Sequence, residues 1–289
     1  MLEFSSTADG EQIPVYFVTP TNRESPAKAV VVLHGSGGLW NDQDSNGDGV
    51  GDICDIGSLT AQFREWESLL REKGYAVAFP DSYSTRNTCE NEGAFKSPPL
   101  KFTISATFIR NHDAIGTLQL LKQLVWEDSG LPVIDIKNVA LLGFSDGGSA
   151  VLSSIYDVNA TPANWKWKQS FDGVDYTKEI REPIDSELKF KTAVVYYPGS
   201  YHNGYYGNVC GTTGIYQSYC DIMFNLPEDD ALTENSECLV ASMVDLGGGI
   251  PSVEHYSNTG HGFDSNDQPE SAVARNKSLQ FLQQQLKGE

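Results

Sequence analysis

Residues 143–147 read Gly-Phe-Ser-Asp-Gly, a G-x-S-x-G pattern that places one serine between two glycines. The pattern follows the apolar run Val-Ala-Leu-Leu at 139–142 and opens a helix that we predict to begin at Asp146. A serine in such a strand-to-helix turn directs its Oγ outward at the sheet edge, and the helix N-terminus beside it favours developing negative charge. Glycine-rich turns occur in many α/β proteins, but both flanks of this one favour a nucleophile at Ser145.

A serine hydroxyl needs a base that takes its proton, and the chain offers five histidines for this role. Where this serine motif is catalytic, the chain order is serine, acid, histidine, so the base must follow Ser145. His255 and His261 come late enough. His255 lies in the alternating strand pattern Ser-Val-Glu-His-Tyr, whereas His261 lies in a glycine-flanked loop after that strand. We therefore predict that His261 is the base.

The imidazole in turn needs a carboxylate to orient it, and two adjacent aspartates follow the strand predicted at 221–226. We favour Asp230 and keep Asp229 as the alternative, since one of the two must be a solvated surface charge. The charge that develops on a reacting carbonyl oxygen needs two backbone N–H donors. The residue after the nucleophile, Asp146, supplies one, and Ser36 in His-Gly-Ser-Gly-Gly at 34–38 supplies the other.

Residues 41–55 (NDQDSNGDGVGDICD) carry oxygen ligands at the spacing of a calcium-binding loop, with Gly49 at the sharp turn. The stretch resembles one thrombospondin type 3 repeat. The alternative is an acidic, glycine-rich loop without an ion, although carboxylates at this density repel one another. We expect a structural Ca²⁺ and no organic cofactor. The predicted ligands are Asp44, Asn46, Asp48, the carbonyl of Val50, Asp52 and Asp55.

Apolar runs alternate with amphipathic helical repeats, which predicts an α/β fold with a doubly wound, mostly parallel sheet in one domain, 1–289. We predict strands at 29–35, 76–81, 138–144, 192–197, 221–226 and 252–256. Helices are predicted at 59–74, at 115–125, from Asp146 onward and around 279–286. The calcium loop at 41–55 and an extra helix-to-strand segment at 158–190 are insertions into this pattern.

Segments that follow parallel strands meet at the carboxyl edge of the sheet, where open α/β folds bind ligands. This places 35–58, 80–105, 198–219, 227–233 and 257–270 on the working face. The segment 158–190 leads from a helix into a strand, so we expect it at the opposite edge. We interpret Trp165 and Trp167 in that segment as packing residues rather than substrate contacts.

Charge and cysteine content limit the partners and the compartment. The net charge of −19 over 289 residues disfavours nucleic acid and anionic membrane surfaces as partners. No apolar run reaches the roughly 20 residues of a membrane-spanning helix, and we expect no signal peptide in the chain as given. Two disulfides, one of them Cys54–Cys89, predict a secreted or periplasmic protein. The cysteines, none in a C-x-x-C pair, are Cys54, Cys89, Cys210, Cys220 and Cys238.

Six segments of the chain together resemble the dienelactone hydrolase family of α/β-hydrolases. They are VVVLHGSGGL, GYAVAFPDSY, GFSDGG, AVVYYPG, PEDDALT and TGHGF, in family order from residue 30 to 263. The resemblance implies the α/β-hydrolase fold, a triad of Ser145, Asp230 and His261, and oxyanion donors at Ser36 and Asp146.

Three positions depart from the family, whose type members have a cysteine nucleophile, an acidic residue at the position of Gly35 and two arginines around a substrate carboxylate. Arg86 falls near the position of the first arginine, and the second has no equivalent in His-Gly-Phe-Asp-Ser at 261–265. We therefore expect a serine esterase acting on small carboxylic esters, with Arg86 and Tyr197 as substrate-binding residues. The alternatives are a lactone or peptide-bond hydrolase, and a calcium-dependent binding or adhesion protein on a hydrolase scaffold. The oligomeric state is not indicated.

Overall fold

The computed structural model describes residues 1–20, 26–45, 53–89, 104–160, 162, 166–171, 174–179, 188–199, 210–211, 214–247, 251–265 and 268–287. For residues 108, 166–171 and 174–179 it describes the backbone alone.

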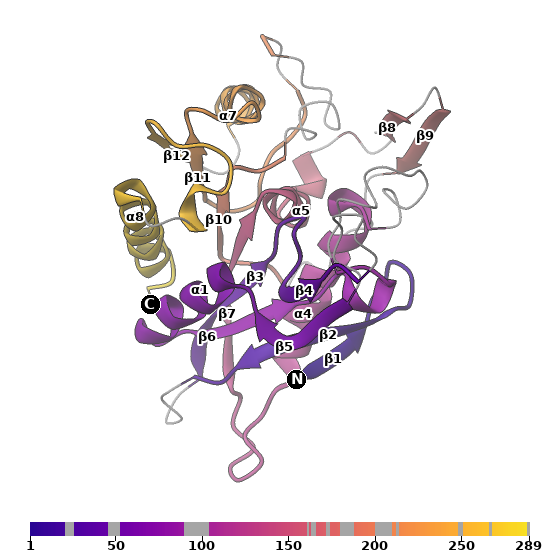
Figure 1. Ribbon diagram of the computed structural model, residues 1–289, viewed down its shortest axis with the longest axis vertical. Helices are drawn as coiled ribbons and strands as arrows, with labels where there is room; N and C mark the ends of the chain where they lie inside the picture. Colours follow the sequence, from indigo (N-terminus) through magenta and orange to yellow (C-terminus); the bar gives the residue numbers. More distant parts are fainter. Residues whose placement is uncertain are drawn as a thin grey trace.

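The centre of the molecule is an eight-stranded sheet (Figure 1). Six neighbouring strands run parallel, and two strands near the N-terminus add an antiparallel edge. The predicted parallel sheet is confirmed, and the N-terminal edge is an addition that the sequence pattern had not indicated. In spatial order the strands are β1 (Leu2–Ser5), β2 (Gln12–Val18), β6 (Ala76–Pro80), β3 (Ala27–Leu33), β7 (Ile134–Phe144), β10 (Thr192–Tyr196), β11 (Ile222–Pro227) and β12 (Pro251–Tyr256).

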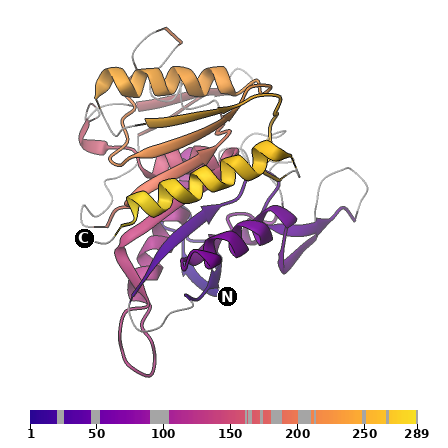
Figure 2. The ribbon, with the colours of Figure 1, turned by 90° about the vertical axis from the view of Figure 1, so that its left-hand side faces the viewer.

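Helices cover both faces of this sheet, as Figures 1 and 2 show. Side chains of α1 (Ala61–Glu72) and α8 (Pro269–Gln285) pack on one face. Those of α4 (Asn111–Gln123), α5 (Asp146–Ser154) and α7 (Thr233–Leu246) pack on the other. Short helical turns lie at η1 (Ser84–Arg86), η2 (Ala106–Arg110), η3 (Val158–Ala160) and η4 (Phe263–Ser265).

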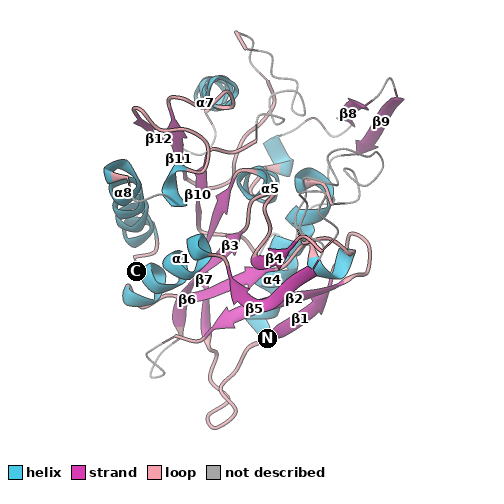
Figure 3. Cartoon of the chain, viewed as in Figure 1, coloured by secondary structure: helices cyan, strands magenta, loops and turns pink. Residues whose placement is uncertain are grey.

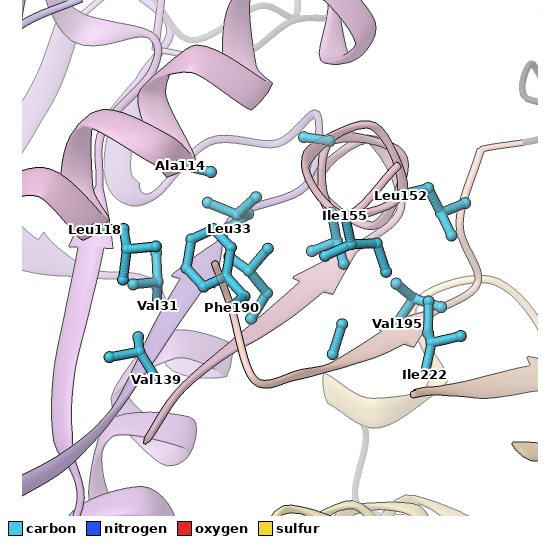
Figure 4. Packing of buried hydrophobic residues seen from close by; sticks show 14 of the residues in the cluster. Val31, Leu33, Ala114, Leu118, Val139, Leu152, Ile155, Phe190, Val195 and Ile222 are labelled. Carbon is cyan, nitrogen blue, oxygen red and sulfur yellow. The ribbon is translucent and has the colours of Figure 1, made fainter. Parts of the chain in front are cut away.

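The apolar run in β3 shows why the sheet is buried on both sides. Val30 and Val32 belong to the core cluster under α1 and α8, whereas Val31 and Leu33 belong to the cluster under α4 and α5 (Figure 4). All four are at most 1% exposed. Successive side chains of a strand point to opposite faces, so a continuous run of branched residues fills both layers.

Two short hairpins form separate two-stranded sheets, whose strands are drawn in magenta in Figure 3. One pairs β4 (Trp40–Gln43) with β5 (Ile53–Leu59), and the other pairs β8 (Lys166–Phe171) with β9 (Val174–Glu179). The second hairpin lies within the predicted insertion 158–190. Trp165 and the side chain of Trp167 lie outside the described residues, so their predicted packing role stays a prediction.

Two disulfides are formed, Cys54–Cys89 and Cys210–Cys238, and Cys220 is a free thiol. The preferred pairing of Cys54 with Cys89 is thus confirmed, and it joins β5 to the segment after η1. In the described part of the chain, no helix is long and apolar enough to cross a membrane.

Candidate active site

Ser145 lies in a strained turn between β7 and α5. Its φ is 51° and its ψ is −116°, in the left-handed half of backbone space that residues other than glycine rarely occupy. The Ser145 N–H donates to the Tyr196 carbonyl at 3.0 Å. A Cβ at Gly147 would overlap the carbonyl oxygens at the end of β3, and one at Gly143 would overlap the Gly147 carbonyl. The two glycines of the motif therefore let the first turn of α5 approach the sheet closely enough to hold this conformation.

His261 lies between Ser145 and Asp230 and hydrogen-bonds to both. Its Nε2 is 2.8 Å from the Ser145 Oγ, and its Nδ1 is 2.6 Å from an Asp230 carboxylate oxygen. With a proton on Nδ1, the imidazole donates to Asp230 and presents an acceptor to the serine hydroxyl. The side chain of Asp230 is 6% exposed and that of His261 is 42% exposed. This geometry suits a base that reaches substrate while its partner carboxylate stays covered.

Asp229 and His255, the two alternative candidates for the acid and the base, contact other residues. Asp229 is exposed, and its backbone N–H donates to the Thr259 carbonyl at 2.9 Å, which ties the two loops together. His255 pairs with Glu237 at 2.8 Å on the surface. Of each pair, the structure places the favoured residue in the hydrogen-bonded chain: His261 contacts the Ser145 Oγ, and Asp230 contacts His261.

Tyr197 supports the histidine and does not offer its hydroxyl to a substrate. Its ring centroid lies 4.6 Å from that of His261, and the side chain is 3% exposed. The hydroxyl donates to Asp264 and accepts from Gln62 at 3.2 Å. Burial raises the pKa of the Tyr197 hydroxyl well above its ordinary value, so it stays protonated. Tyr197 was predicted to bind substrate; its hydroxyl is instead bound by Asp264 and Gln62, and its ring packs on His261.

Asp264 anchors the loop that carries His261. The carboxylate is 1% exposed and accepts from Gln62 at 2.9 Å, from the Trp66 indole at 3.0 Å, and from Tyr197. Burial raises the pKa of Asp264, and these three donors oppose that rise. Gln62 and Trp66 belong to α1, so Asp264 fixes the histidine loop to a helix.

The predicted oxyanion donors lie in the turn after β3 and at the start of α5. Within the described residues, neither the Ser36 N–H nor the Asp146 N–H donates to a protein acceptor. The side chain of His34, which precedes this turn, is fully buried, and burial and the nearby Arg110 hold its pKa well below the ordinary value. Its Nε2 accepts from the Ser82 N–H at 3.3 Å, which assigns the ring proton to Nδ1 and makes the 2.9 Å contact with the Gly35 carbonyl a donation. Arg110 Nη2 also lies 3.3 Å from Nδ1, but in this tautomer Nδ1 does not accept from it.

Arg86 is an internal ion-pairing residue, which corrects its predicted substrate-binding role. Its Nε lies 2.8 Å from Asp9, and its Nη1 lies 2.7 Å from Asp113 and 2.8 Å from the Ser82 carbonyl. Its Nη2 donates to Asp9 at 3.2 Å and to Asp113 at 3.1 Å. All five N–H groups of the guanidinium are thus used, and the side chain is 3% exposed. Arg86 has no donor to offer a substrate carboxylate.

Sequence reasoning missed three residues around this site: His34, Arg110 and Asp264. Asp264 lies three residues after His261, but the residues that follow it, Ser265, Asn266 and Asp267, are polar, so nothing in the local sequence indicates a buried carboxylate. Arg110 belongs to no local motif, and the partners of its guanidinium, His34, Tyr83 and Asp146, are scattered along the chain.

Only the ends of the predicted calcium loop are described. Asp44 and Asp55 are exposed, whereas Asn46, Asp48, Val50 and Asp52 lie outside the described residues. The pairing of Gln43 with Ile53 brings the two ends of the loop together, and the Cys54–Cys89 disulfide holds the second strand. Among the described residues, no group of three or more acidic, histidine or cysteine side chains is placed to hold a metal.

No protein-family model matches the chain, and no curated protein matches it. Solved structures match it over nearly its whole length. Esterase 2 of Thermogutta terrifontis, phosphonylated by cyclosarin, is 12% identical with a TM-score of 0.60, covering 97% of this chain and 92% of that one. A protein of Klebsiella pneumoniae described as a dienelactone hydrolase is 15% identical with a TM-score of 0.57, covering 98% and 96%. The chain has the α/β-hydrolase fold.

The α/β-hydrolase fold explains the chain order of the three hydrogen-bonded residues. Ser145 follows β7, Asp230 follows β11 and His261 follows β12. Each lies just past the carboxyl end of a parallel strand, so the sheet brings them to one edge although 116 positions separate the first from the last.

Replacing Arg86 tests its internal role. We expect Arg86→Met to lower the free energy of unfolding by about 3–5 kcal/mol, because it leaves the buried Asp113 carboxylate without its partner. Arg71→Met is the matched control, since Arg71 pairs with Glu67 on the surface of α1, and should change the value by at most about 1 kcal/mol. Urea unfolding followed by tryptophan fluorescence measures both. A loss for Arg86→Met no larger than for Arg71→Met would contradict the internal role.

Proposed function

We propose that the protein is a serine hydrolase that cleaves small carboxylic esters. The observation that carries the proposal is the hydrogen-bonded chain from the Ser145 Oγ through His261 to Asp230. The strained turn at Ser145 and the fold shared with esterases support it. The net charge of −19 does not favour nucleic acid or an anionic membrane as a partner.

In the proposed mechanism, the Ser145 Oγ attacks the ester carbonyl while its proton passes to His261 Nε2. The carbonyl π electrons move onto the oxygen, which the Ser36 and Asp146 N–H groups stabilise. As the C–O bond to the alcohol breaks, His261 returns the proton to the leaving oxygen, and an acyl-serine remains. Water then attacks the acyl carbon while one of its protons passes to His261, and His261 gives that proton to the Ser145 Oγ as the acyl C–Oγ bond breaks, which releases the acid. Asp230 holds the imidazole and stabilises its charged form throughout.

Short, uncharged acyl groups are the proposed substrates. Structures of the Thermogutta terrifontis esterase hold propionate and butyrate, and we take these acyl lengths as the starting point for this chain. Because the guanidinium of Arg86 is fully paired internally, the family's anchor for a substrate carboxylate is not available from that residue. This favours neutral esters over dienelactones. Lactones and peptide bonds remain alternatives that the same three residues would serve.

We further propose that Ca²⁺ bound at 44–55 is structural and that the protein works outside the cytoplasm. The carboxylates of Asp44, Asp48, Asp52 and Asp55, with Asn46 and the Val50 carbonyl, suit a hard cation. The hairpin that closes this segment supports the assignment, and the two disulfides support an oxidising compartment. The proposed reaction needs no metal, so the ion would steady the loop after the oxyanion turn.

The first test of the proposed function is Ser145→Ala, assayed with p-nitrophenyl acetate, propionate and butyrate. We expect kcat to fall by about 10⁴-fold or more, because the variant has no nucleophile. The thermal midpoint should stay within about 2 °C of wild type, since no core contact is lost. Turnover by the variant close to that of wild type would remove Ser145 as the nucleophile. A wild-type protein inactive on all three esters would favour the calcium-dependent binding protein instead.

The two adjacent aspartates provide an internal comparison. We expect Asp230→Asn to lower kcat by about 10³–10⁴-fold, because an amide no longer favours the tautomer with the proton on Nδ1. Asp229→Asn, one residue away and exposed, should leave kcat close to wild type. The measurement is steady-state kinetics on p-nitrophenyl butyrate for both variants. If Asp229→Asn lowered kcat and Asp230→Asn did not, Asp229 would be the carboxylate that orients His261.

Removing the ion tests the calcium site. A ligand that binds the native state alone stabilises it by about 2.7 kcal/mol when its free concentration is 100 times Kd. We therefore expect EDTA to lower the melting temperature and added Ca²⁺ to restore it. Asp48→Asn/Asp52→Asn should melt like the chelated protein and lose its response to Ca²⁺. A melting curve that EDTA leaves unmoved would mean that 41–55 is an acidic insertion without an ion.

A further inference from the structure

Arg110 is a buried cation that the proposed mechanism does not use. It ends η2, directly before α4, and is 1% exposed. Its Nη2 donates to the His34 carbonyl at 2.5 Å, and its Nη1 donates to an Asp146 carboxylate oxygen at 2.5 Å. Tyr83 completes the group, since its hydroxyl lies 3.1 Å from the same carboxylate oxygen and 3.3 Å from Nη1. One planar guanidinium therefore binds two segments that are far apart in sequence.

These two segments carry the proposed oxyanion donors. The ladder between β3 and β7 ends at the pair Leu33–Gly143, before either donor is reached. Beyond that pair, the first segment runs from His34 to Ser36 and the second runs to Asp146. Within the described residues, Arg110 is the side chain that hydrogen-bonds to both segments. Its rigid fork fixes their separation after the backbone ladder has ended.

The contact between Arg110 and the His34 carbonyl also bears on the direction of the Ser36 N–H. The Gly35 carbonyl accepts from the His34 Nδ1 at 2.9 Å and from the Gly38 N–H at 3.2 Å. In a planar trans peptide the N–H points away from the C=O, so fixing the Gly35 oxygen aims the Ser36 N–H in the opposite direction. Arg110 holds the His34 backbone from which this imidazole projects.

The contact between Arg110 and Asp146 involves a carboxylate whose charge, if it were unpaired, would oppose the proposed reaction. The Asp146 carboxylate belongs to the residue that follows the nucleophile, close to where negative charge develops on the substrate oxygen. Like charges repel most strongly in a site with little water. The pairing with Arg110 balances the charge of this carboxylate, so that it does not oppose the proposed donation from the Asp146 N–H to the oxyanion.

We propose that Arg110 is a positioning residue that clamps the two oxyanion donors of Ser36 and Asp146 at the spacing the tetrahedral intermediate requires. This proposal rests on the proposed esterase function and goes beyond it. The clamp acts when charge has moved onto the carbonyl oxygen, so its loss should affect kcat and hardly affect KM.

The test compares Arg110→Met/Asp146→Asn with Asp146→Asn alone. The amide introduced by Asp146→Asn keeps an oxygen that accepts from Arg110, so the pair of variants differs in the guanidinium while neither contains an unpaired carboxylate at this position. Arg110→Met by itself strands Asp146 and is liable to unfold, which the double variant avoids. Arg71→Met is the control for losing a surface arginine. Labelling to completion with a fluorophosphonate, followed by intact mass, counts the folded sites in each preparation.

Two readouts separate a clamp from a merely structural residue. One is kcat and KM per labelled site on p-nitrophenyl butyrate. The other is the Ki of an alkyl trifluoromethyl ketone, whose carbonyl carbon bonds to the Ser145 Oγ while the serine proton passes to His261 and the oxygen becomes an oxyanion. Relative to Asp146→Asn, we expect kcat to fall by about 10- to 100-fold, less than or equal to the loss of one whole oxyanion donor. The Ki should rise by a similar factor, with KM unchanged within about twofold.

The outcomes are distinguishable. If kcat per site and Ki match those of Asp146→Asn while only the melting temperature falls, Arg110 stabilises the fold and the clamp is overturned. If KM rises while kcat holds, Arg110 acts on substrate binding and the clamp is again overturned. A wild-type protein that neither turns over esters nor takes the fluorophosphonate would overturn the proposed function, on which the clamp depends.

Discussion

The backbone conformation of Ser145 is the constraint on which the rest of the site depends. At φ 51° and ψ −116° the residue is strained, and it persists because β7 ends and α5 begins on either side of it. That arrangement is possible only if the first turn of α5 lies against the end of β3, where a side chain at Gly147 would collide with two carbonyl oxygens. The strain places the Oγ at the sheet edge, and the same close approach brings the Ser36 turn beside the helix N-terminus. The position of Ser145 and that of the neighbouring turn at Ser36 thus both depend on this packing contact.

The interior of this acidic protein is organised around two buried arginines. Arg86 joins the N-terminal turn at Asp9 to α4 at Asp113, and Arg110 joins the end of β3 to the start of α5. Burial alone would lower the pKa of each guanidinium, but the carboxylates around them raise it, so both stay charged. A buried cation is tolerated when its charge is paired nearby. All five N–H groups of Arg86 are hydrogen-bonded, whereas the Nε of Arg110 has no partner among the described residues. Two buried ion-paired cations therefore hold the segments around the sheet edge.

The sequence predicts those features that depend on a few neighbouring residues or on a regular apolar periodicity. The alternation in β3, the turn at Ser145 and the glycine-flanked loop at His261 are each visible in fewer than a dozen neighbouring residues, and the parallel sheet then brings them together. Arg86 was assigned wrongly because its neighbours in sequence say nothing of Asp9, 77 positions away, or Asp113. The strand β1 was missed for a similar reason: alternating exposed and half-buried residues at an edge give a weak apolar signal.

The loop that carries His261 is held in place by contacts on both sides of the histidine. Glycines flank it in sequence, and its side chain is the most exposed of the three hydrogen-bonded residues. The loop is nevertheless fixed on both sides. Before the histidine, the Thr259 carbonyl accepts from the backbone N–H of Asp229. After it, the Asp264 carboxylate accepts from Gln62 of α1 and from the Tyr197 hydroxyl. Tyr197, itself at a φ of 36°, then presses its ring against the imidazole. In its proposed role as a base, His261 has to be exposed enough to meet a substrate and ordered enough to keep one tautomer. The loop leaves the imidazole exposed, and the buried Asp264 holds the loop in place.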